Sequence, residues 1–88
     1  MIKTIHLTDG EISVINLDGQ HVHIRNFGST SVYVSKTPGI VPDADGVLRI
    51  SGGTSGTMSG VDGVIHLLGS DEQTVLIYST DDIRSPFN

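Results

Sequence analysis

The feature that most constrains this chain is an alternation of apolar and polar residues, with a period of two, along almost its whole length. Successive side chains of a β-strand point to opposite faces, so this alternation lets one face be buried while the other faces outward. Val22 and Ile24 share one face in this way, and so do Val32 and Val34. No stretch shows the three-to-four-residue spacing of an amphipathic helix. The pattern therefore predicts a chain made of strands.

Turn-forming residues divide the alternation into short segments. Glycine and Asp-Gly pairs, which favour tight turns, recur about every 8–12 residues. The segments expected to be strands are residues 2–7, 11–16, 21–26, 31–35, 47–51, 55–58, 64–69 and 74–79. Strands of this length and spacing are typical of sandwiches and barrels. The predicted fold is all-β, a small antiparallel β-sandwich or barrel of about seven or eight short strands, jelly-roll-like.

The length of the chain allows one small domain. Residues 1–80 are expected to form a single β-domain, and residues 81–88 a polar C-terminal tail. A domain of this size buries only about 60–65% of its unfolded surface, so its core is thin. The chain has no cysteine, so disulfides cannot add stability. Contacts with further copies would supply the missing core.

Two segments are apolar on both faces. Residues 64–69 and 74–79 are the most apolar of the expected strands, and polar residues interrupt them little. Strands of this kind are usually covered on both sides. We expect the domain core to cover one face and another subunit to cover the other.

The stretch from Ser51 to Gly63 holds five glycines and three serines, and it invites comparison with a phosphate-binding loop. A P-loop ends in Gly-Lys followed by Ser or Thr, whereas Gly56 is followed by Thr57 and the stretch has no lysine. Apolar strands flank it too closely for a linker. We expect a short strand over residues 55–58 between two glycine turns, with small residues that allow close approach to a neighbour.

His21 and His23 would project from the same face of a strand, as a pair of metal ligands does. A metal site needs at least a third ligand, and the other histidines, His6 and His66, each stand alone in their segments. Val22 and Ile24 would occupy the opposite, buried face. The interpretation favoured is two solvent-facing or interface histidines, and no metal site is predicted.

The start of a calcium loop is suggested by Asp43 and Asp45, but the twelfth residue of that loop is Thr54 rather than Glu. An ordinary Asp-Gly turn is favoured, and an irregular calcium site that also uses Asp62 is the alternative. No serine lies in a G-x-S-x-G motif, and no nucleophile is paired with a base by local spacing. No catalytic residue and no cofactor are predicted, and the chain is not expected to be an enzyme.

The charge pattern disfavours nucleic acid as a partner. Ten acidic and five basic residues give a net charge of −5, and the basic residues are scattered. A nucleic-acid surface normally concentrates positive charge on one face. No apolar segment is long enough to span a membrane, so no membrane insertion is expected.

A succession of short motifs runs across most of the chain. In order they are Tyr33-Val34-Ser35, the loop at residues 38–47, Gly52-Gly53, His66-Leu67-Leu68-Gly69 and Pro86-Phe87. This succession resembles small structural proteins encoded in bacteriophage and prophage genomes. The matching positions are turn and core residues, so the resemblance brings no enzymatic residue with it.

The resemblance implies a virion protein, a capsid decoration or head-fibre component, synthesised in the host bacterial cytoplasm. It implies a homo-oligomer, with a trimer favoured, and the phage major capsid protein or other virion proteins as partners. The alternative is a receptor- or glycan-binding module of a phage fibre or tail, which would use the loop at residues 36–46. A small metal enzyme of cupin type, suggested only by His21 and His23, is a third class.

The C-terminal tail carries apolar residues at an otherwise polar end. We expect subunit or shell contacts at Ile83, Pro86 and Phe87. The alternative interpretation of the same residues is a frayed terminus.

Overall fold

The computed structural model describes residues 2–42, 44–69 and 71–81, and these form eight strands and no helix. The strands are β1 (Ile2–Leu7), β2 (Ile12–Asn16), β3 (His21–Asn26), β4 (Val32–Ser35), β5 (Val47–Ile50), β6 (Ser55–Met58), β7 (Val64–Gly69) and β8 (Gln73–Thr80). The all-β prediction is confirmed. The expected bounds differ from the observed ones by one residue at a few ends, where β2 begins at Ile12 and β8 extends to Thr80.

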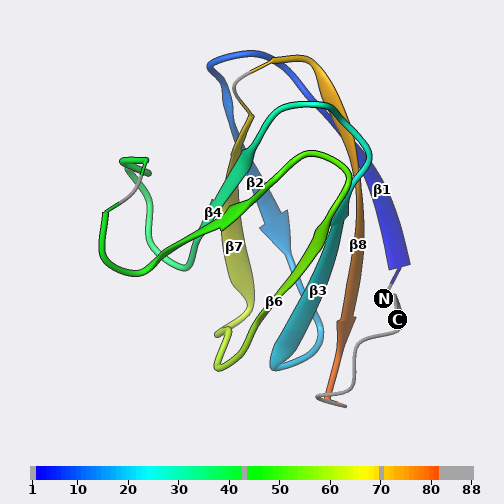
Figure 1. The fold of residues 1–88 in the computed structure, drawn as a ribbon. Coiled ribbons are helices and arrows are strands. Elements are labelled where there is room, and N and C mark those ends of the chain that lie inside the picture. Colours follow the sequence, from blue (N-terminus) through cyan, green and yellow to red (C-terminus); the bar gives the residue numbers. More distant parts are fainter. Residues whose placement is uncertain (1, 43, 70, 82–88) are drawn as a thin grey trace.

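The strands form two four-stranded antiparallel sheets that pack face to face (Figure 1). The first sheet has the order β1-β8-β3-β6, and the second has the order β2-β7-β4-β5. Strand β1 pairs with β8, β2 with β7, β3 with β6, and β4 with β5, all antiparallel. This is the pairing of one long hairpin folded over on itself, which defines a jelly roll. The predicted sandwich is therefore confirmed, with jelly-roll topology.

The core lies between the sheets and is built from the alternate residues that the sequence pattern singled out. Val22 and Ile24 of β3 have no exposed surface, and neither do Val32 and Val34 of β4. The other buried apolar side chains of this cluster are Leu7, Ile15, Ile50, Met58, Val61, Ile65, Leu67, Val75 and Ile77. Burial of these groups supplies the main driving force for folding.

A buried polar group joins the two sheets at one end of this core. The Asn26 side-chain amide donates to the carbonyl oxygen of Thr30 at 2.8 Å and to that of Ile50 on β5 at 3.1 Å. Its oxygen accepts from the backbone N–H of Gly28 at 2.9 Å. The Gln73 side chain, almost fully buried, donates to the same Asn26 oxygen and to Thr30. The sequence pattern did not predict Gln73 as a core residue.

The glycine-rich stretch forms β6 between two turns, as predicted. Gly53, Gly60 and Gly63 all have positive φ, a conformation that side chains disfavour. Gly56 points inward, and a Cβ there would lie 3.1 Å from Ile50 Cγ1 and 3.3 Å from Leu48 Cδ2. The missing side chain therefore lets β6, on the edge of the first sheet, approach β5, on the edge of the second.

Candidate functional site

The outer face of the second sheet carries a group of apolar side chains. The outward side chains are found by the strand register, which places Ile12 opposite Leu68 and Leu68 opposite Tyr33. We call apolar face the six apolar members of this outward set: Ile12, Val14, Tyr33, Val47, Val64 and Leu68. The same register also turns four polar residues outward, namely Asn16, Ser35, His66 and Arg49. Within the apolar face, Ile12 is 44% exposed and Val14 is 57% exposed, and the other four members are half-buried. Because the core is complete without them, these side chains are free to contact another surface.

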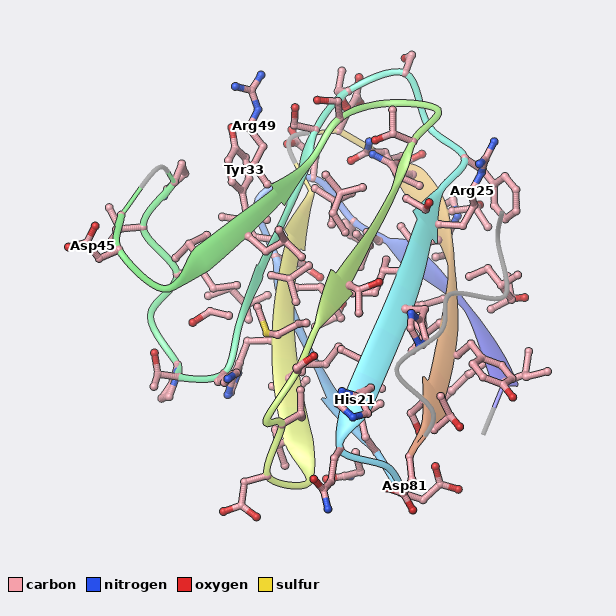
Figure 2. The ribbon with its side chains drawn as sticks, turned by 60° about the horizontal axis from the view of Figure 1, so that its bottom comes forward. His21, Arg25, Tyr33, Asp45, Arg49 and Asp81 are labelled. Carbon is pink, nitrogen blue, oxygen red and sulfur yellow. The ribbon has the colours of Figure 1, made fainter. Side chains whose placement is uncertain are left out.

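Charged groups of opposite sign lie at the two edges of the apolar face. Arg49 pairs with Tyr33 on the β5 edge, and its guanidinium donates to Ser31 Oγ at 3.0 Å. Figure 2 shows Tyr33 and Arg49 side by side, far from His21 and Asp81 at the other end of the molecule. The opposite edge is β2. Four exposed carboxylates lie in the two turns at the start of β2 and the end of β7, and we call them the acidic corner: Asp9, Glu11, Asp71 and Glu72.

The acidic corner is assembled from two turns. Gly10 N–H donates to the Gly69 carbonyl at 3.3 Å, which joins the turn before β2 to the end of β7. The strand register pairs Ile12 with Leu68, Leu68 with Tyr33 and Tyr33 with Arg49, so these four residues form one row across the sheet. The acidic corner and Arg49 therefore lie at the same end of the strands, on either side of a sheet in which the axes of β2 and β5 are about 14 Å apart.

The histidine pair lies on the outer face of the first sheet. His21 and His23 share a face opposite the buried Val22 and Ile24, as the alternation predicted. His21 Nδ1 lies 2.9 Å from Ser59 Oγ, and His23 Nδ1 lies 2.9 Å from Thr57 Oγ1. Of the two alternatives predicted, solvent-facing or interface histidines, the first is wrong for His23, which has no exposed surface and lies beside the Tyr78 ring. Alternation identifies a face, but it does not identify what covers that face.

The histidines do not gather into a metal site. His6 lies on β1 and hydrogen-bonds Thr74, two strands from His21, while His66 belongs to the other sheet. No group of three or more histidine or acidic side chains suited to a metal ion occurs in the part of the chain that the structure describes. Asp43, the first carboxylate of the alternative calcium loop, lies outside the described residues.

One exposed carboxylate is tied to the end of β8. The Ser79 hydroxyl donates to Asp18 Oδ1, and the Asp18 backbone N–H donates back to Ser79 Oγ at 3.4 Å. The hydrogen bond from Ser79 lowers the pKa of the Asp18 carboxyl, because it stabilises the charged form. This pair fastens the link between β2 and β3 to the last strand.

The loop between β4 and β5 projects beyond the body of the sandwich (Figure 1). Within this loop Ile40 is buried, whereas Val41 beside it is 61% exposed. The Ser35 hydroxyl accepts from the Thr37 backbone N–H at 3.1 Å, which orders the start of the loop. The tail residues Ile83, Pro86 and Phe87, where contacts were predicted, lie outside the described residues.

The part of the chain that the structure describes has no surface pocket. It also contains no helix of the length and apolarity needed to cross a bilayer. The alternation at residues 12–15 already carried a signal for the apolar face, because Ile12 and Val14 fall on the side opposite Ser13 and the buried Ile15. The apolar runs in the sequence indicate two-sided strands only at residues 64–69 and 74–79.

Comparisons with known proteins identify no relative of this chain. No protein-family model matches the chain, and neither curated proteins nor solved structures give a match. The jelly-roll fold by itself is compatible with many functions, so the function depends on the surfaces that the fold presents.

Proposed function

We propose that this chain is a non-enzymatic structural protein of a bacteriophage particle, an oligomeric capsid decoration or head-fibre component. The observation that carries the proposal is the apolar face. A strand such as β7 buries Ile65 and Leu67 in the core and still presents Val64 and Leu68 on its outer side, with His66 between them. Exposed apolar patches of this kind mark surfaces that contact other proteins.

The size of the domain supports the same proposal. A chain of 88 residues has a thin core, and assembly with further copies or with a shell would bury apolar surface that the single chain leaves exposed. The resemblance of the motifs at residues 33–35, 38–47 and 66–69 to phage structural proteins supplies the particle context. The partners proposed are further copies of the chain and the major capsid protein or another virion protein.

Purified particles test this proposal. We expect the chain to sediment with intact phage particles, to be present in many copies by mass spectrometry, and to be labelled on the particle surface by an antibody. The control is the same host culture without particle induction. A chain that is abundant in the cell lysate but missing from purified particles would contradict the proposal.

A receptor- or glycan-binding module is the second candidate, and the projecting loop between β4 and β5 favours it. An exposed apolar side chain such as Val41 on a projecting loop is placed to touch a ligand. Replacement of residues 37–45 by a short Gly-Ser linker should then abolish binding to host cells. Unchanged cell binding by this variant, with the fold intact by circular dichroism, would rule this candidate out.

A further inference from the structure

The two edges of the apolar face are complementary to each other. One edge, at β2, carries exposed Ile12 and the acidic corner, and the other edge, at β5, carries Arg49. Apolar surface can drive an association, while charged groups at its rim select the partner and its orientation. A copy of this chain therefore carries both halves of a matching contact.

We propose that copies of this chain associate head to tail, with the β2 edge and acidic corner of one copy against the β5 edge and Arg49 of the next. The proposed function includes self-assembly, and the contact proposed here is the surface that this self-assembly would use. The inference therefore rests in part on the proposed function. The apolar face then turns inward, where neighbouring copies cover it.

The alternative two-fold contact is disfavoured by charge. If two β2 edges met antiparallel, the acidic Glu11 at the start of one strand would approach the end of the other, where Asp18 follows β2. Like charges placed opposite each other oppose such a pairing. The β5 edge offers the opposite sign at Arg49, so a heterologous contact satisfies both groups.

The positions of the charged groups along the strand direction favour a closed ring. Rotation about an axis leaves the height of each atom along that axis unchanged, so two surfaces that meet in a closed ring must lie at the same height. The register places Ile12 and Arg49 in one row across the second sheet, and the acidic corner adjoins that row. An axis parallel to the strands would therefore bring Arg49 of each copy to the acidic corner of its neighbour. A trimer, expected from the resemblance, is a closed ring of this kind.

Charge reversal at the two edges tests the contact. Light scattering on the full chain at micromolar concentration should give a multiple of the 9.3 kDa chain mass, with a trimer expected. Arg49→Glu and the double variant Asp9→Lys/Glu11→Lys should each weaken association by about 100-fold or more, because like charges then meet at the contact. Arg25→Glu is the matched control, since it reverses an arginine charge on the outer face of the first sheet, away from both edges of the second, and it should assemble like the unaltered chain.

Mixing the two edge variants separates a head-to-tail contact from any other. Arg49→Glu keeps an intact acidic corner, and Asp9→Lys/Glu11→Lys keeps an intact Arg49 edge, so an equimolar mixture should form a larger species that contains both chains. A monomeric unaltered chain, assembly of Arg49→Glu at normal strength, dispersal by Arg25→Glu, or a mixture that stays monomeric would each overturn the inference. A chain that is monomeric in solution yet present on particles would overturn this contact and leave the proposed virion role standing.

Discussion

At the scale of single residues, Asn26 ties the two sheets together through buried hydrogen bonds. It sits on β3, and its amide reaches the carbonyl oxygens of Thr30 and of Ile50 on the opposite sheet. The oxygen of the same amide also has a partner, since it accepts from the backbone N–H of Gly28. Backbone groups buried without a partner are costly, so these bonds satisfy groups that the crossing between the sheets would otherwise leave unpaired.

Removal of this amide should be strongly destabilising. We expect Asn26→Ala to lower the free energy of unfolding by about 2–4 kcal/mol, since several buried polar groups lose their partner at once. Urea denaturation followed by circular dichroism measures the change. Asn16→Ala is the matched control, because Asn16 is exposed on β2 and its loss should change stability by less than about 0.5 kcal/mol. Equal effects of the two variants would contradict this role for Asn26.

The Asp18 carboxylate should make stability depend on pH in the acid range. Its pKa is lowered below the ordinary value of 3.8 by the Ser79 hydroxyl, so the unfolded chain binds the proton more tightly. The stabilisation is therefore fully present above pH 3.8 and is lost as pH falls through the lower pKa of the folded chain.

Thermal unfolding of Asp18→Asn across pH checks this. We expect a lower melting temperature than that of the unaltered chain at neutral pH, and a difference that shrinks as the pH falls below 3.8. Asp62→Asn, at an exposed aspartate in the link between β6 and β7, is the control. A difference that stays constant down to the lowest pH would show that the effect is not one of titration.

At the scale of elements, the bounds of the strands could largely be predicted from the sequence, but the residues that pack against each strand could not. Local alternation and glycine turns were enough to locate β3, β6 and β7 with the observed bounds. The burial of His23 depends on Thr57, thirty-four residues away, and on Tyr78, in a still later strand. The pairing of Gln73 with Asn26 likewise joins β8 to β3. A pattern with a period of two carries no information on such distant partners.

The same limit applies to the candidate site. The apolar run at residues 64–69 predicts a strand with apolar residues on both faces, and the structure places Val64 and Leu68 on the outside of β7, with His66 between them. The opposed positions of Arg49 and the acidic corner follow only from the order of the strands in the second sheet. Residues far apart in the chain reach one surface through that order.

The close approach of β6 and β5 depends on the missing side chain of Gly56. We expect Gly56→Val to lower the free energy of unfolding by about 1–3 kcal/mol, because its side chain would crowd Ile50 and Leu48. Ser55→Val is the matched control, since it introduces the same side chain on the outward face of the same strand. Denaturant unfolding of both variants measures the difference, and a Gly56→Val chain as stable as Ser55→Val would refute the explanation.

At the scale of the whole molecule, the two faces of the second sheet should respond differently to the same change. Val14→Thr alters an exposed side chain of the apolar face, and we expect it to weaken self-association while stability changes by less than about 0.5 kcal/mol. Val34→Thr places a hydroxyl in the core, where it should cost about 1–3 kcal/mol. Light scattering and urea denaturation of both variants separate the effects, and a large stability loss from Val14→Thr would contradict an outward role.

The pairing of β1 with β8 has a consequence for how the chain reaches its fold. The earliest strand finds its partner in the latest one, and β8 also lies between β1 and β3 in the first sheet. A ribosome releases β1 long before β8 exists, so the first sheet cannot close until synthesis has passed Thr80. The hairpin of β4 and β5, in the middle of the chain, is the pair with the shortest loop to close. Because long-range pairs dominate, folding in milliseconds to seconds is expected, with the nascent chain left open until its final strand emerges.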